Sequence, residues 1–63
     1  MSVKRNEFLQ YLATHKCFLQ RHGSKHDIYK NETKNKQTTV PRHPKLDKLL
    51  CEAICKQLEI PRF

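Results

Sequence analysis

The sequence predicts a small α+β domain in which a three-stranded antiparallel sheet lies between an N-terminal and a C-terminal helix. Segments with apolar residues at helical spacing stand near both ends of the chain, and three short strand-like runs separated by turn signals stand between them. With 63 residues, the chain is expected to be a single domain, 1–63, of a size that buries only about 60% of its unfolded surface. Chemistry is therefore expected on an exposed face, which suits a polymeric substrate.

The first helix is predicted from Lys4 to about His15, with Ser2 as its N-cap. Apolar residues recur on one face of this segment at the spacing of an amphipathic helix. They are Phe8, Leu9, Leu12 and Ala13.

Three strands are expected to follow. Residues 17–22 and 26–31 form a hairpin across the turn Gly23-Ser24-Lys25, and residues 36–40 form a third strand that ends at Pro41. The segment 41–44 is expected to be extended, because residues that precede a proline avoid the helical region.

The closing helix is predicted from an apolar stripe, with Asp47 as its cap and Pro61 beyond its end. The stripe consists of Leu46, Leu50, Ala53, Ile54 and Leu58. Two helices that pack on one face of a small sheet would bury both stripes and leave the other sheet face open to solvent.

The chain is strongly basic, with 13 Lys and Arg against six Asp and Glu and a formal net charge of +7. Seven of these cations and three of the four histidines lie within residues 20–45. Such an excess favours a polyanionic partner, with nucleic acid first, an acidic protein second and an anionic membrane surface third. A solvated basic surface without a partner is the plain alternative.

The cysteines, Cys17, Cys51 and Cys55, are odd in number, which disfavours a disulfide framework. No apolar run approaches the ~18 residues of a membrane span, and no stretch resembles a signal peptide. We therefore expect reduced thiols, a cytoplasmic location and no membrane partner.

The stretch 23–29 combines groups suited to gripping a phosphate. It holds the only glycine of the chain, followed by a hydroxyl at Ser24, a cation at Lys25 and an imidazole at His26. Glycine permits unusual backbone angles and close approach of another backbone. Histidine exchanges protons near neutral pH.

The ordered residues resemble the HicA toxins of bacterial type II toxin–antitoxin pairs. The resemblance runs from the first helix almost to the C-terminus. It rests on Arg21, the turn Gly23-Ser24-Lys25-His26, Tyr29, the run Val40-Pro41-Arg42-His43-Pro44 and the helix 49–58. A Gly-Ser-x-His turn alone would be a weak signal, whereas the whole ordered set is specific.

This resemblance implies a fold similar to a double-stranded-RNA-binding domain and metal-independent cleavage of mRNA. It also implies neutralisation by a HicB-type antitoxin, and no small-molecule cofactor. The catalytic histidine of the family maps onto His26, aligned by Tyr29, since many relatives read Gly-Ser-His without the intervening Lys25. Glu59 stands where many relatives have a helix-ending glycine.

RNA carries its own nucleophile, because a base that removes the proton of a 2′-hydroxyl lets that oxygen attack the adjacent phosphorus. We expect His26 to be this base, with charge on the phosphorane stabilised by Arg21, Lys25 and backbone N–H groups near Gly23. The predicted RNA-binding residues are Arg21, Gly23, Ser24, Lys25, Tyr29, Lys30, Arg42 and His43.

Several roles stay open. His43 could supply a general acid, although a histidine between prolines is more often a surface residue, and His22 could contact phosphate or be solvated. Tyr29 could stack on a base or lie in the core; strand alternation places it opposite His26 and Ile28 in either case.

A zinc site formed by Cys17, His22 and His26 lacks a second ligand pair, so no metal is expected. The alternative function is a non-catalytic RNA-binding module with the same basic face. A structural protein that binds an acidic partner is a third possibility.

Overall fold

The computed structural model describes residues 2–63. Two helices and five strands follow one another along the chain. They are β1 (Ser2–Lys4), α1 (Arg5–Thr14), β2 (Cys17–His22), β3 (His26–Asn31), β4 (Lys36–Pro41), β5 (Lys45–Asp47) and α2 (Lys48–Leu58).

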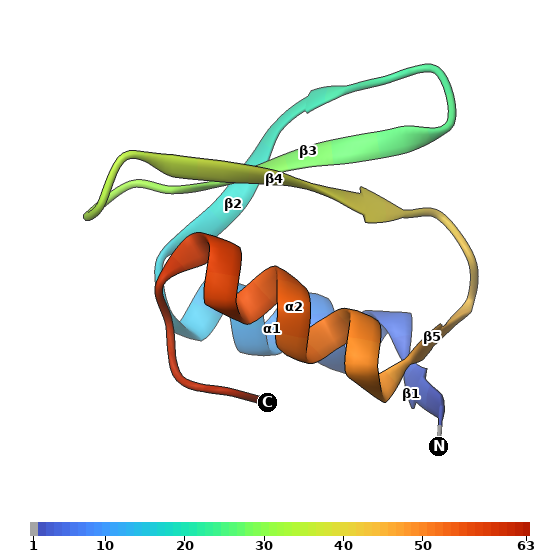
Figure 1. The fold of residues 1–63 in the computed structure, drawn as a ribbon. Coiled ribbons are helices and arrows are strands. Elements are labelled where there is room, and N and C mark those ends of the chain that lie inside the picture. The colour runs from blue at the N-terminus through green and yellow to red at the C-terminus, as the bar shows by residue number, and fades with distance from the viewer. Residues whose placement is uncertain (1) are drawn as a thin grey trace.

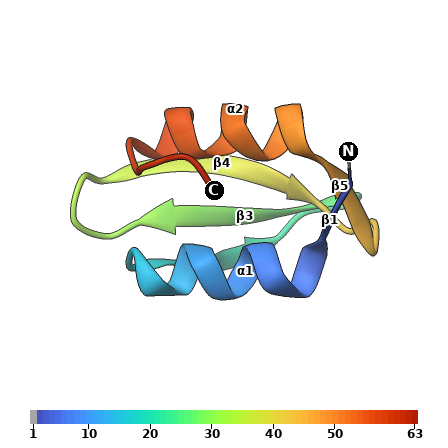
Figure 2. The ribbon, with the colours of Figure 1, turned by 90° about the horizontal axis from the view of Figure 1, so that it is seen from below.

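Strands β2, β3 and β4 form an antiparallel sheet in that order. Helices α1 and α2 lie side by side on one face of this sheet and run in the same direction, as Figures 1 and 2 show. The other sheet face is left uncovered. The predicted helix–three strands–helix order, and with it the α+β class, is confirmed. No helix within residues 2–63 is long and apolar enough to cross a membrane.

A second, two-stranded sheet was not predicted. Strand β1 pairs with β5 in antiparallel fashion, with Val3 opposite Leu46. The expected N-cap role of Ser2 is wrong, because Ser2 lies in β1 and Lys4 occupies the N-cap position. The backbone N–H of Arg5 donates to the carbonyl of Pro44 at 2.9 Å, so the chain between β4 and β5 satisfies one N–H of the first turn of α1.

The buried side chains of both helices meet those of the sheet in one core, and the residues are Phe8, Leu12, Cys17, Tyr29, Val40, Leu46, Cys51, Ile54, Cys55 and Leu58. The predicted stripe of the closing helix is partly wrong, since Leu50 and Ala53 are exposed and Leu46 belongs to β5.

Helix α2 instead buries positions 51, 54, 55 and 58, a face with i, i+3, i+4, i+7 spacing that uses two cysteines as apolar residues. In α1 the expected stripe is confirmed at Phe8 and Leu12, whereas Leu9 is half-buried and Ala13 is exposed.

Asn31 ties the end of β3 to the end of α2. Its Nδ2 donates to the carbonyl of Leu58 at 2.6 Å, and its Oδ1 accepts from the backbone N–H groups of Thr33 and Lys34. Asn31 is buried, and these contacts satisfy both ends of its amide while closing the turn between β3 and β4.

Helix α2 ends at Glu59, which adopts the left-handed conformation with φ 58° and ψ 46°. Glycine meets no Cβ penalty in this conformation. We expect Glu59→Gly to raise the free energy of unfolding by about 1 kcal/mol, the lower end of the cost of a left-handed residue other than glycine. The exposed Lys36–Glu59 ion pair at 3.5 Å would offset little of this gain. Urea unfolding followed by circular dichroism measures the change, and Glu59→Gln is the control that loses the charge alone; a glycine variant no more stable than the glutamine variant would contradict the expectation.

Candidate active site

An irregularity in the β2–β3 hairpin sets which side chains meet at its end. Leu19 lies opposite Tyr29, but Arg21 lies opposite Ile28, so Gln20 is an extra residue in β2. Because of this bulge, His22 rather than Arg21 lies opposite Asp27. The bulge thus assigns His22 to the helix side of the sheet and Arg21 to the open side.

The turn between β2 and β3 closes tightly on Gly23. The backbone N–H of Gly23 donates to the carbonyl of His26 at 2.7 Å. A Cβ on Gly23 would lie 2.6 Å from that same carbonyl oxygen. Gly23 does not have a positive φ, so close approach of the two backbones, rather than an unusual backbone angle, requires glycine here.

His26 is the first residue of β3 and lies opposite Pro41 of β4. The alternation of burial along β3 places His26 and Ile28 on the open sheet face and Asp27 and Tyr29 on the helix side. The imidazole of His26 is exposed, and no hydrogen bond holds it within residues 2–63. It is therefore accessible to a polymer laid over the hairpin end.

Behind the turn, the buried carboxylate of Asp27 gathers three cationic or titratable side chains. Its Oδ2 accepts from Nη2 of Arg5 at 2.9 Å, and its Oδ1 accepts from Nε of Arg42 at 2.9 Å. Nδ1 of His22 lies 2.8 Å from Oδ1. Arg42 also donates from Nη2 to the carbonyl of Gly23 at 2.6 Å, so the cluster holds the turn in place.

The hydrogen bond from His22, together with the hydrogen bond and charge of Arg42, lowers the pKa of Asp27 from 3.8 to about 2, although burial opposes this shift. Asp27 is thus ionised near neutral pH, and an ionised carboxylate can only accept hydrogen bonds. The proton between the two side chains therefore sits on Nδ1 of His22. The other ring nitrogen, Nε2, does not face Asp27 and belongs to a side chain that is 69% exposed.

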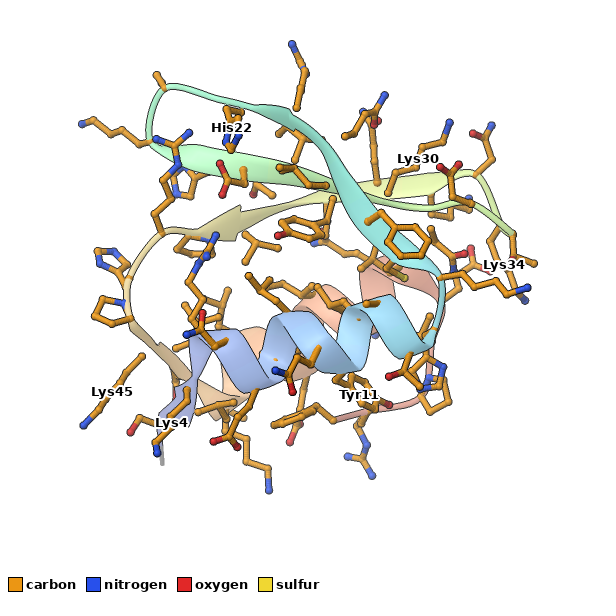
Figure 3. The ribbon with its side chains drawn as sticks, turned by 180° about the vertical axis from the view of Figure 1, so that it is seen from behind. Lys4, Tyr11, His22, Lys30, Lys34 and Lys45 are labelled. Carbon is orange, nitrogen blue, oxygen red and sulfur yellow. The ribbon has the colours of Figure 1, made fainter. Side chains whose placement is uncertain are left out.

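The predicted RNA-binding residues separate into two groups. Arg21, Ser24 and Lys25 are exposed at or beside the turn, and Arg42 reaches the turn through Gly23. By contrast, Lys30 lies near the other end of β3, away from His22, as Figure 3 shows. His43 is exposed in the segment between β4 and β5 and has no hydrogen-bond partner within residues 2–63.

Tyr29 is 9% exposed and belongs to the core. Of the two roles that the sequence left open, the structure favours the core role, and the ring offers no face for base stacking. The possible zinc ligands are engaged elsewhere: Cys17 is buried with its Sγ 3.6 Å from the carbonyl of His15, and His22 faces Asp27. Within residues 2–63 there is no group of three His, Cys, Asp or Glu side chains placed to hold a metal.

Sequence reasoning missed Asp27 and Arg5 as parts of this site. A signal was present, because placing Tyr29 in the core puts Asp27 on the same buried side, and a buried carboxylate requires cations or donors around it. The sequence could not identify those partners, because Arg5 and Arg42 lie 22 and 15 residues away along the chain.

The depressed pKa of Asp27 predicts an acid-dependent loss of stability. Because the folded-state pKa lies below the ordinary value, ionised Asp27 stabilises the fold above about pH 4, and this contribution is lost as the pH falls from 3.8 toward 2. As the pH is lowered from 5 to 2, the melting temperature of the parent should fall more steeply than that of Asp27→Asn. Glu52→Gln, at a partly exposed 4.0 Å pair with Arg62, is the control whose melting temperature should fall as steeply as that of the parent. Equal slopes for all three proteins would refute the assignment.

A scan against protein-family models matches residues 5–60 of this chain to the HicA toxin of bacterial toxin–antitoxin systems. No curated protein and no solved structure gives a significant match, so the likeness to a double-stranded-RNA-binding domain stays a prediction. The matched range spans both helices, the three-stranded sheet and the hairpin with His26. The chain therefore belongs to the HicA toxin family of bacterial toxin–antitoxin systems.

Proposed function

We propose that this toxin is a metal-independent endoribonuclease that cleaves mRNA, with His26 as the general base. The observation that carries the proposal is an exposed imidazole at the end of a basic hairpin, in a chain of the HicA toxin family. Lys25 precedes this imidazole directly, and Arg21 and Arg42 flank the same turn. A net charge of +7 favours binding of the RNA backbone.

The chemistry requires little machinery. His26 would take the proton of a 2′-hydroxyl, the 2′-oxygen would attack the adjacent phosphorus, and cleavage would leave a cyclic phosphate and a free 5′-hydroxyl. The N–H of Gly23 is already bonded to the carbonyl of His26. The charge on the phosphorane would therefore be stabilised by the side chains of Lys25 and Arg21 rather than by that N–H.

Family membership implies an antitoxin partner, and we propose that it is of the HicB type. An acidic inhibitor would be steered toward the basic face. If it covered the open sheet face at His26, it would stop cleavage by occlusion. We also propose a cytoplasmic location, where mRNA is available. The three free, buried cysteines are compatible with a reducing compartment.

A second candidate function is a non-catalytic RNA-binding module. One observation favours it: no side chain within residues 2–63 hydrogen-bonds to the imidazole of His26, whereas a general base is commonly oriented by a partner. The basic hairpin would serve RNA binding equally well in this case.

The test is incubation of the purified protein, with EDTA present, against a long unstructured RNA, followed by mapping of the product ends. Cleavage with cyclic phosphate termini supports the proposed ribonuclease. RNA that is bound but stays intact would overturn it in favour of the binding module. Affinity alone does not separate the two functions, because both involve many phosphate contacts and should weaken with salt.

A further inference from the structure

A second histidine at the hairpin has the features of an oriented acid–base group. Nδ1 of His22 lies 2.8 Å from a carboxylate oxygen of Asp27, and Asp27 is buried while the side chain of His22 is 69% exposed. A buried carboxylate that binds one ring nitrogen fixes the tautomer and the orientation of an imidazole and presents its other nitrogen for proton transfer. The exposed His26 lacks such a partner within residues 2–63.

We propose that His22 is the general acid of the cleavage reaction, with Asp27 as its positioning residue. This inference rests on the proposed ribonuclease function. It assigns to His22 the protonation of the leaving 5′-oxygen, a step that the single base His26 leaves without a donor.

The two histidines flank the same turn. His22 is the last residue of β2 and His26 is the first of β3, and the bond from Gly23 N–H to the His26 carbonyl closes the turn between them. The bulge at Gln20 puts His22 opposite Asp27 on one side of the sheet, while His26 lies on the other side. In an in-line displacement the attacking and leaving oxygens stand on opposite sides of phosphorus. A phosphodiester laid across the turn would therefore have one histidine toward each oxygen.

The proton balance of this step is complete. Nε2 of neutral His26 accepts the 2′-hydroxyl proton, the 2′-oxygen forms its bond to phosphorus, and the bond from phosphorus to the 5′-oxygen breaks. Protonated His22 gives its Nε2 proton to that 5′-oxygen and keeps the proton on Nδ1, which donates to the carboxylate of Asp27. Exchange with water then returns both rings to their starting states, and no oxidant, reductant or metal is needed.

Neither of the other histidines has this arrangement. The ring of His15 packs against the ring of Tyr11 in a tilted arrangement, with a centroid separation of 4.6 Å, at the end of α1. His43 is exposed and has no carboxylate partner within residues 2–63. The structure therefore favours His22 over His43 as the acid.

The test uses two short RNA substrates that differ in one atom. One has an ordinary linkage, and the other has sulfur in place of the bridging 5′-oxygen at the cleaved position. A thiolate leaves without protonation because it is a much weaker base than an alkoxide. The rates of the parent, His22→Gln, His26→Ala and His15→Gln are measured on both substrates, and circular dichroism establishes that each variant is folded.

We expect His22→Gln to lose at least about 100-fold in rate on the ordinary linkage, and to recover most of that loss on the sulfur linkage. His26→Ala should be slow on both substrates, and His15→Gln should match the parent. A His22→Gln variant that equals the parent on the ordinary linkage, or is equally slow on both linkages, would overturn the assignment of a general acid. Failure of the parent to cut either substrate would instead refute the ribonuclease function itself.

Discussion

Replacing His26 by alanine is expected to lower the rate of RNA cleavage by about 10²–10⁴-fold, the usual contribution of a positioned acid–base group. The affinity for RNA should stay nearly unchanged. The physical reason is that the imidazole is exposed and makes no hydrogen bond within residues 2–63. The substitution therefore removes no contact that holds the hairpin. The cations Arg21 and Lys25, which we propose bind phosphate, remain in place.

The measurement pairs a single-turnover cleavage assay in EDTA with a filter-binding assay at two salt concentrations. His15→Ala is the matched control, since His15 lies at the end of α1 and should leave both readouts at the parental level. Cleavage by the alanine variant at the parental rate would remove His26 from the mechanism. Loss of RNA affinity in parallel with cleavage would make His26 a binding residue instead.

Local sequence signals predicted the main elements well, because each was bounded by a strong chemical marker. Gly23 separates β2 from β3, Pro41 ends β4, and the periodic apolar residues define both helices. The sequence did not predict the pairing of β1 with β5, because each strand has three residues. A period-2 pattern of that length cannot be distinguished from the start of a helix. The predicted stripe of α2 differs from its buried face because the prediction relies on leucine, whereas Cys51 and Cys55 are fully buried as small apolar side chains.

The site was predicted less completely than the fold. The order of the residues predicts the hairpin and places His26 at its end. The sheet face on which His26 lies depends on whether Ile28 or Tyr29 is buried, and the alternation of strand residues does not decide between these two. Tyr29 is the residue that packs into the core, so Asp27 is a buried carboxylate and His26 carries an exposed imidazole. The bulge at Gln20 has no marker in the sequence, yet it determines that His22 is the partner of Asp27.

The second large effect on RNA cleavage is expected from Gly23→Ala in the turn between β2 and β3. At a position with room for a Cβ, this change would stabilise the protein by about 0.4–1 kcal/mol through the unfolded state. Here the Cβ would lie 2.6 Å from a backbone oxygen of His26, so the turn must open. Opening breaks the bond from Gly23 N–H to that oxygen and displaces the Gly23 carbonyl from Arg42. Since a shift of about 1 Å in a catalytic group can cost about 100-fold in rate, we expect cleavage to fall by that order.

The domain should stay folded, because Gly23 lies outside the core formed by the helices and the sheet. Amide spectra recorded by NMR should show changes concentrated around the β2–β3 turn, at His22, Ser24 and His26. Thr33→Ala, in the turn at the opposite end of β3, is the matched control that should keep parental cleavage. Parental activity in Gly23→Ala would mean that the geometry of this turn does not position the reacting groups. Global unfolding would mean that the turn is needed for the fold, because a closed hairpin would then be a condition for packing Asp27 between Arg5 and Arg42.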